Sequence, residues 1–227
     1  TGALGLSQPR SGEPMKTDDL ISLLATGAAP VPTNAVGRRF AVALSCGFPI
    51  AVLIMVVTFG IRADLAQALS EWILWLKLAF AGSLALAGLI ATERLARPGV
   101  RLGRVWAALV APVLVLWLIA ATVLITAAPA QRGDLILGDT WKTCAFNIAL
   151  ISLPLLAATL WAMKGLAPTR PALAGASAGL LAGALGTLVY ALHCPESGAP
   201  FVAIWYVLGI AIPTLAGVVL GPRVLRW

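Results

Sequence analysis

Six long runs of apolar residues, separated by short polar segments, dominate the pattern along this chain. They cover approximately residues 40–61, 72–91, 105–128, 143–163, 172–193 and 201–220. A helix needs about 20 mostly apolar residues to cross the hydrocarbon core of a bilayer. The pattern therefore predicts an all-α, polytopic membrane protein, with a bundle of six transmembrane helices occupying residues 40–220.

Composition agrees with a membrane protein and changes the meaning of the charge. The chain is 60% hydrophobic and only 11% charged, with a mean hydropathy of +0.95, whereas about a quarter of the residues in a soluble domain are charged. A net charge of +7 would indicate nucleic-acid binding in a soluble protein. Here we expect membrane lipid as the direct contact and no direct contact with nucleic acid, because basic residues in short loops set membrane topology.

The basic residues fall mainly into one alternating set of loops. The richer set contains Lys16, Arg38, Arg39, Arg94, Arg97, Arg101, Arg104, Lys164, Arg170, Arg223 and Arg226. The opposite set contains only Arg62, Arg132 and Lys142. Because the loops rich in Lys and Arg face the cytoplasm, we expect both termini on the cytoplasmic side.

The segment before the first apolar run divides at Met15. Residues 1–14 differ in character from the rest of the chain, and we interpret them as an expression remnant or an extension from an early start. Residues 15–39 are then a cytoplasmic tail, and residues 221–227 a cytoplasmic C-terminus. No signal peptide is expected at Met15, because Asp18 and Asp19 fall where a positive region should be.

The tail carries a short helix pattern, "TDDLISLLATG". Thr17 suits an N-cap, and the two following carboxylates suit the positive end of a helix dipole. Leucines at i, i+3 and i+4 then make a narrow apolar stripe. A helix lying on the membrane surface would normally be rich in Lys and Arg, so a groove on a protein partner is favoured. The candidate partner-binding residues are Asp18, Asp19, Leu20, Ile21, Leu23 and Leu24.

Two of the three cysteines are expected at the same depth. Cys144 and Cys194 lie at the outer ends of the fourth and fifth apolar runs, which a short turn connects. Short connections favour antiparallel neighbours, so the thiols can come close to each other. His193 is adjacent to Cys194, Glu196 lies two residues after Cys194, and Lys142 lies two residues before Cys144. A disulfide, a reactive thiol site or transient heavy-metal binding all remain open, as does simple burial of small apolar residues.

Three other features have a structural interpretation beside a functional one. Gly175, Gly179 and Gly183 recur every four residues, which favours close helix packing. Cys46, on the cytoplasmic side of the first run, is interpreted as an ordinary buried cysteine. Lys77 is the only charge well inside a run; it is either a functional residue or an ammonium that extends to the interface.

The chain resembles the NrsF family of bacterial membrane anti-sigma factors (negative regulator of sigma F) from Met15 to its end. The resemblance rests on the start "MKTDDLISLL", the six spans, "LKLAF" in the second span and "RPG" at 97–99. It rests also on Cys144 and Cys194, "IWY" at 204–206 and the closing "GPRVLRW". Cys46 and the fourteen leading residues depart from the pattern.

The resemblance implies a specific function. Such proteins hold an extracytoplasmic-function sigma factor at the bacterial inner membrane, and chromate, cadmium or related thiol-directed stress leads to its release. Cys144 and Cys194 match the sensing pair of the family, and Asp18 to Leu24 match the sigma-contacting tail. From the residues alone, His193 is a candidate auxiliary or metal ligand beside Cys194. No resident cofactor and no enzymatic activity are expected.

Two other functions stay open from the residues alone. A membrane thiol oxidoreductase could use Cys144 and Cys194, but such enzymes usually show a Cys-x-x-Cys element or a second cysteine pair, and neither is present. A small proton-coupled transporter usually needs a carboxylate within the membrane, and no Asp or Glu lies deep in any run.

Overall fold

The computed structural model describes residues 17–26 and 34–226. The expected extension at 1–14, the expected start at Met15 and the basic residue Lys16 lie outside the described residues. The chain divides into two compact units, Thr1–Ala35 and Val36–Trp227, each described here by itself.

The larger unit is built of helices. Its long helices are α2 (Ala35–Thr58), α4 (Trp72–Leu95), α5 (Val105–Thr126), α7 (Trp141–Met163), α8 (Pro171–Tyr190) and α10 (Val207–Val224). Shorter helical segments are α3 (Leu65–Ala68), η1 (Pro129–Gln131), α6 (Arg132–Leu137), α9 (Ala199–Phe201) and the π-helical turn η2 (Val202–Tyr206).

Within the described part of the chain, six helical stretches are long and apolar enough to cross a membrane. This confirms the prediction of an all-α protein with six spans. The fourth stretch differs in extent, because it runs from Pro129 to Met163 and includes η1 and α6. Proline is favoured in the first turn of a helix, which agrees with a helical start at Pro129. The apolar pattern did not predict this extension, because α6 contains polar residues.

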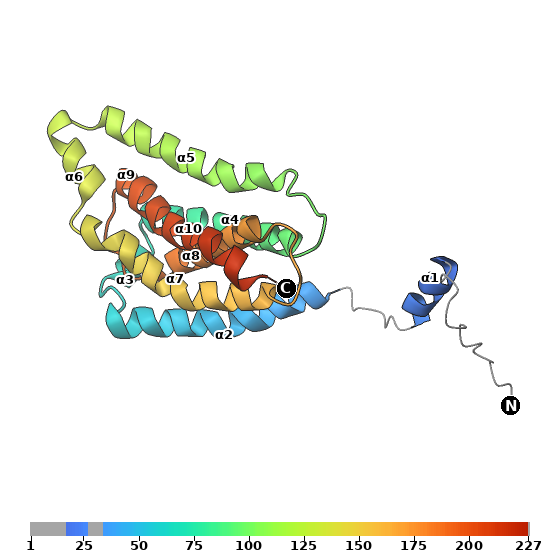
Figure 1. Ribbon diagram of the computed structural model, residues 1–227. Coiled ribbons are helices and arrows are strands. Elements are labelled where there is room, and N and C mark those ends of the chain that lie inside the picture. Colours follow the sequence, from blue (N-terminus) through green and yellow to red (C-terminus); the bar gives the residue numbers. More distant parts are fainter. Residues whose placement is uncertain (1–16, 27–33, 227) are drawn as a thin grey trace. The chain divides into compact units, whose positions relative to one another are not determined.

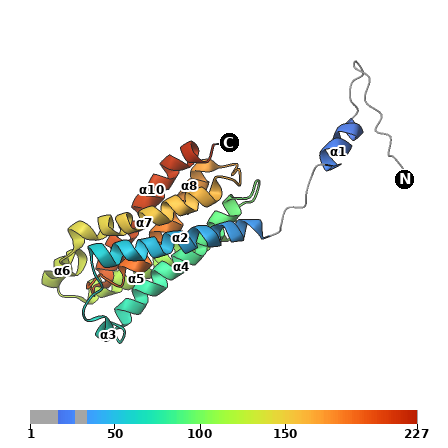
Figure 2. The ribbon, with the colours of Figure 1, turned by 90° about the horizontal axis from the view of Figure 1, so that it is seen from below.

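Helix α8 lies at the centre of the bundle and packs against α4, α7 and α10. Its sequence alternates alanine and glycine with leucine, and small residues allow neighbouring helix backbones to approach closely. Figures 1 and 2 show α2 and α5 on opposite sides of the bundle. Only 11% of the apolar stretch of α5 is buried inside the protein. Its exposed side chains Leu114, Leu118 and Ile125 are therefore suited to contact lipid.

The glycines of α8 form its contact with α10. A Cβ atom on Gly175 would meet the carbonyl of Gly217, and one on Gly179 would meet the carbonyl of Pro213. A Cβ atom on Gly183 would lie 3.0 Å from the Cα atom of Ile210. The three glycines thus share one face, on which the two backbones touch.

The bundle has two chemically different ends. The thiol end is formed by the connections 59–71, 127–140 and 191–198, and the arginine end by 96–104, 164–170 and the C-terminal residues 225–226. Figure 1 shows α3 and α6 at the first end, and the C-terminus and the start of α2 at the second. The sequence predicts that the arginine end faces the cytoplasm.

The smaller unit contains the helix predicted in the tail. Helix α1 spans Thr17–Thr26, so the helix exists as the sequence pattern predicts, and Thr17, expected as its N-cap, is its first residue. Asp18 is exposed, and the side chains of Leu20 and Ile21 are 42% and 58% exposed. The side chains of Asp19, Leu23 and Leu24 lie outside the described part of the structure.

Candidate functional site

The structure brings Cys144 and Cys194 together at the thiol end. Cys144 lies in the first turn of α7, and Cys194 follows the last residue of α8, Tyr190. Both residues are 0% exposed and neither forms a disulfide. Their side chains interact directly, with the Cys144 thiol donating to the Cys194 sulfur. The pair therefore consists of two free thiols in contact, shielded from solvent.

Hydrogen bonds of the main chain fix the segment that carries Cys194. The Cys194 amide donates to the carbonyl of Tyr190 over 3.1 Å, which continues the last turn of α8. The Arg62 amide donates to the carbonyl of Leu192 over 3.3 Å, which connects the same segment to the residues after α2.

Lys77 of α4 binds the segment that carries Cys194 through its ammonium group. Its side chain is 0% exposed, and its Nζ atom donates to the carbonyl of Cys194 over 3.1 Å and to that of Glu196 over 2.5 Å. The ammonium also lies 5.7 Å from the ring centre of Tyr206. The Lys77 ammonium therefore extends toward the thiol end, where it is buried against the loop after α8 and does not reach solvent.

Glu196 connects the same loop to the start of α7. Its Oε1 atom accepts hydrogen bonds from the amides of Asp139 and Thr140 and from the Thr140 hydroxyl, each 2.9 Å long. These two amides directly precede the first residue of α7, Trp141, and a carboxylate is stabilised near the positive N-terminal end of a helix. Gly138 permits this approach: its φ is +56°, and a Cβ atom would collide with the carboxylate.

Two tyrosines complete the walls of the site. The ring centres of Tyr190 and Tyr206 lie 6.2 Å apart, and both side chains contact the thiol pair. The Tyr206 hydroxyl is the one buried side-chain polar atom without a regular hydrogen-bond partner among the described residues. Tyr206 ends the π-helical turn η2, and such turns often occur at functional sites.

These neighbours favour ionisation of Cys194. The hydrogen bond from the Cys144 thiol, followed by the positive charge of Lys77, lowers the pKa of Cys194 to about 6, while burial opposes the shift. A thiolate, and not a thiol, is the form that attacks electrophiles and binds metals. The surroundings of Cys194 therefore favour its reactive thiolate form.

The other groups suggested by the sequence point elsewhere. The Nδ1 atom of His193 lies 3.0 Å from the carbonyl of Gly60, and its ring packs against Phe59 and Tyr190. Lys142 lies over the ring of Trp141 at 5.5 Å. Among the described residues, no three His, Cys, Asp or Glu side chains are grouped closely enough to hold a metal ion. The structure therefore does not bring His193 into the thiol pair.

Cys46 is separate from this site. It lies in the middle of α2 and is exposed, so its expected burial is wrong. The first apolar run did not show which side of α2 faces the bundle.

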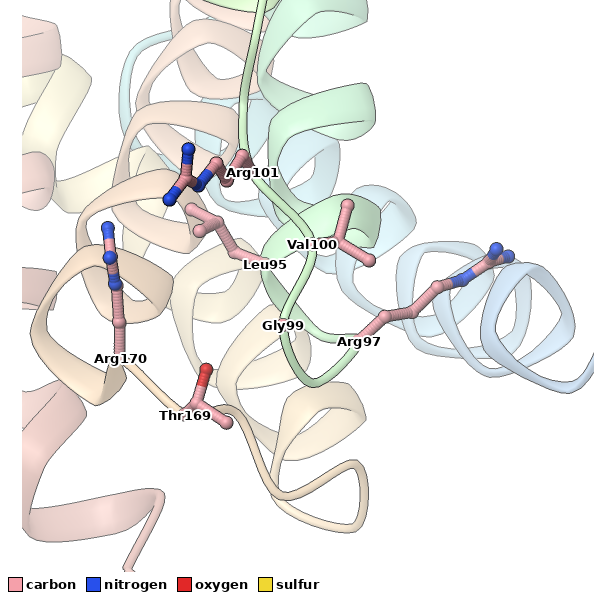
Figure 3. A pocket seen from close by; sticks show the side chains of 7 residues that line it. All are labelled: Leu95, Arg97, Gly99, Val100, Arg101, Thr169 and Arg170. Carbon is pink, nitrogen blue, oxygen red and sulfur yellow. The ribbon is translucent and has the colours of Figure 1, made fainter.

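A second candidate site is a pocket of about 240 Å³ at the arginine end. Leu95, Gly99, Val100 and Thr169 line it together with Arg97, Arg101 and Arg170. Figure 3 shows Arg101 and Arg170 extending toward the same side, while Arg97 extends away from them. No acidic side chain is among these lining residues, so the pocket has a positive potential.

Comparisons with known proteins agree with the resemblance seen in the sequence. The family model for NrsF, described as negative regulator of sigma F, matches residues 24–227. The chain belongs to the NrsF family. A relative from Azospira oryzae, named "Probable anti-sigma-F factor NrsF", is 50% identical over 94% of this chain and 100% of its own length. The "Anti-sigma-F factor NrsF" of Caulobacter vibrioides is 39% identical over 94% of this chain and 100% of its own length. No solved structure matches the chain.

Short motifs that carried the resemblance to NrsF supply residues of the thiol site. Lys77 belongs to "LKLAF" and Tyr206 to "IWY", and both side chains face the pair formed by Cys144 and Cys194. The motifs are far apart along the chain, and the fold brings them to one end of the bundle.

The sequence predicted the two thiols of the site but not the residues that surround and support them. The roles of Glu196 and Tyr206 depend on the turn after α8 and on the π-helical turn, for which the hydrophobic pattern gives no signal. A signal for Lys77 was present, since it lies five residues into α4 from the same end as both thiols. Comparing its depth with that of Cys194 would have indicated a contact.

Proposed function

We propose that this member of the NrsF family is an anti-sigma factor that holds an extracytoplasmic-function sigma factor at the bacterial inner membrane. In this proposal α1 contacts the sigma factor, and reaction of the pair Cys144 and Cys194 on the periplasmic side releases it. The observation that carries the proposal is the pair of free thiols in contact at the end of the bundle opposite to the arginines. The names of both relatives support the sigma factor as partner.

The capture step rests on α1. Exposed Leu20 and Ile21 offer apolar surface, and Asp18 adds negative charge near the start of the helix. A ten-residue helix is marginal alone in water, so binding in an apolar groove of a partner would stabilise it. This mode of recognition, in which an amphipathic helix occupies a groove, recurs among peptide-binding proteins.

The sensing step rests on the connection between the thiols and the helices. Cys144 begins α7, Cys194 follows α8, and Lys77 joins the segment of Cys194 to α4. A change in distance between the sulfurs would therefore act on three helices that extend to the arginine end. A signal shifts such an equilibrium only if it reacts differently with the two conformations.

Two kinds of agent fit this chemistry. An oxidant such as chromate can accept two electrons while the two thiols lose two protons and form one S–S bond. A soft cation such as cadmium can bind the thiolates and displace their protons. Either product would change the position of Cys194 relative to Cys144.

The sensing claim is tested with the double variant Cys144→Ser and Cys194→Ser, with Cys46→Ser as the matched control. We expect the double variant to retain the sigma factor and to lose induction by chromate or cadmium of a reporter that depends on that sigma factor. The control should respond as the parent does. Normal induction in the double variant would contradict the sensing claim.

The capture claim is tested by purifying the full-length protein and a protein lacking residues 1–30, with identification of the proteins bound to each. We expect a sigma factor only with the full-length protein, and its loss in the variant Leu20→Glu with Ile21→Glu. Co-purification of a bound quinone, without a sigma factor, would instead favour a thiol oxidoreductase.

A further inference from the structure

We propose that Lys77 determines which thiol of the pair reacts, by stabilising Cys194 as the attacking thiolate and leaving Cys144 protonated as the second thiol. This inference rests on the proposed sensing function and assigns different roles to the two cysteines.

Lys77 is buried without a carboxylate partner. Its side chain is 0% exposed, and the ion pair found in the described part of the chain is Arg62 with Asp64. A buried charge is costly unless it is paired and hydrogen-bonded. Two carbonyls accept hydrogen bonds from Nζ, and an ammonium has three donors. Lys77 therefore lacks a counter-charge.

Cys194 is the ionisable group best placed to supply this charge. Lys77 hydrogen-bonds the main-chain carbonyl of Cys194 itself, which fixes the ammonium beside that residue. No hydrogen bond joins Lys77 to Cys144 among those that the structure describes. The arrangement is therefore asymmetric, although the two thiols are chemically identical and equally buried.

The other charged and titratable groups near Cys194 are already engaged. Arg62 donates two hydrogen bonds to Asp64, at 2.8 and 2.6 Å, and the negative charge of Glu71 also acts on that arginine. The Glu196 carboxylate accepts from Asp139 and Thr140, and His193 faces Gly60. Tyr190 and Tyr206 contact the thiols through their side chains and supply no positive charge. This leaves Lys77 as the cation that is free to stabilise a thiolate.

The consequence is an order of reaction within the pair. With an alkylating agent such as iodoacetamide, the Cys194 sulfur forms the new S–C bond and iodide leaves, while Cys144 keeps its proton. With a peroxide, the Cys194 thiolate takes one oxygen atom and becomes a sulfenic acid, and a proton from solvent leaves with the second oxygen as water. The Cys144 thiol then displaces a second water from the sulfenic acid, and the disulfide forms.

The test is a pH titration of thiolate absorbance in the ultraviolet, on full-length protein carrying Cys46→Ser in detergent, from about pH 5 to about pH 9. We expect one thiolate to appear with a midpoint near 6. Cys144→Ser should keep this titration, because a serine hydroxyl can still donate to the Cys194 sulfur. Cys194→Ser should abolish it. If the titration is lost in Cys144→Ser and kept in Cys194→Ser, the assignment is overturned.

Substitutions of Lys77 separate its charge from its hydrogen bonds. Lys77→Gln keeps a donor for the carbonyls but removes the charge, and we expect its midpoint to move upward from that of the parent, while the hydrogen bond from Cys144 remains. Lys77→Arg restores the charge and should return the midpoint toward that of the parent. An unchanged midpoint in Lys77→Gln would overturn the role of Lys77. The serine variants keep Lys77 and test the thiol assignment even if the Lys77 variants fail to fold.

This titration needs no sigma factor, so it separates the inference from the proposed function. A shifted midpoint together with normal chromate induction in the double serine variant would support Lys77 and contradict sensing by the pair. An unshifted midpoint in Lys77→Gln together with loss of induction in the double serine variant would contradict the role of Lys77 and support sensing by the pair.

Discussion

At the scale of single residues, Glu196 holds the thiol site together from two directions. Its carboxylate accepts three hydrogen bonds at the start of α7, and its carbonyl accepts one from Lys77 on α4. The loop that carries Cys194 is therefore attached to the two helices that supply the other members of the site. A carboxylate bound to main-chain amides is a strong acceptor, because charged groups form the stronger hydrogen bonds.

Replacement of Glu196 by alanine should loosen this attachment. We expect Glu196→Ala to destabilise the bundle by about 1–3 kcal/mol, because amides near the start of α7 lose their acceptor. Thermal unfolding of the purified protein in detergent measures the effect. Asp139→Asn is the matched control, since that carboxyl is exposed and only its main-chain amide contacts Glu196. Equal melting of the alanine variant and the parent would contradict this role.

The residue scale also shows where sequence reasoning stops. The contact between Cys144 and Cys194 could be expected, because both lie at equal depth in helices joined by a short turn. The direction of the Lys77 side chain could not, because it depends on carbonyls in a loop 117 and 119 residues away in the chain. Apolar periodicity carries no information about such a contact.

At the scale of elements, α8 and α10 pack so closely that their backbones are in direct contact. Gly175 and Gly179 leave no room for a side chain, since an added Cβ atom would meet backbone atoms of α10. Membrane helices gain little from the hydrophobic effect when they associate, so close packing of small residues contributes much of the attraction. The four-residue spacing of the glycines made this face recognisable in the sequence, although it did not identify α10 as the partner.

A single methyl group should disturb this contact. We expect Gly179→Ala to destabilise the protein by about 1–3 kcal/mol, the usual effect of overpacking, because Pro213 and Thr214 would have to move. Gly82→Ala in α4 is the control: its added Cβ atom meets nothing within 4 Å, and alanine is favoured over glycine in a helix by about 0.5–1 kcal/mol. Equal unfolding temperatures for the two variants would contradict the role of the glycine face.

Element boundaries were less predictable than element number. The six apolar runs correspond to the six long helices because length and apolarity together are sufficient to identify a span. The helical start at Pro129 and the π-helical turn at Val202–Tyr206 arise from local backbone geometry and tertiary contacts. Among these contacts, the indole of Trp205 donates to the carbonyl of Ile136 over 2.9 Å, which no periodic pattern indicates.

At the scale of the whole molecule, charge separates the two ends of the bundle. The arginine end carries Arg97, Arg101 and Arg170 around one pocket, and the thiol end carries few basic residues. Basic loops remain on the cytoplasmic side during insertion. The proposal therefore places α1 and the sigma factor on one side of the membrane and the reacting thiols on the other.

Reporter fusions test this orientation. Green fluorescent protein fused after Arg226 should fluoresce in bacteria, because the fusion would fold in the cytoplasm. Alkaline phosphatase inserted at Gly133, in the connection between α5 and α7, should be active, because that enzyme needs an oxidising compartment for its disulfides. The opposite pair of results would place the thiols in the cytoplasm and contradict periplasmic sensing.

The central claim, that the state of the thiol pair controls release of a sigma factor, is tested most directly in purified proteoliposomes loaded with that sigma factor. An oxidant that forms the Cys144–Cys194 disulfide is added, and the sigma factor that remains bound is measured after sedimentation. The account predicts loss of the sigma factor from vesicles of the Cys46→Ser protein and its retention when Cys144 and Cys194 are also serine. Retention in both, with the disulfide verified by mass spectrometry, would contradict the account.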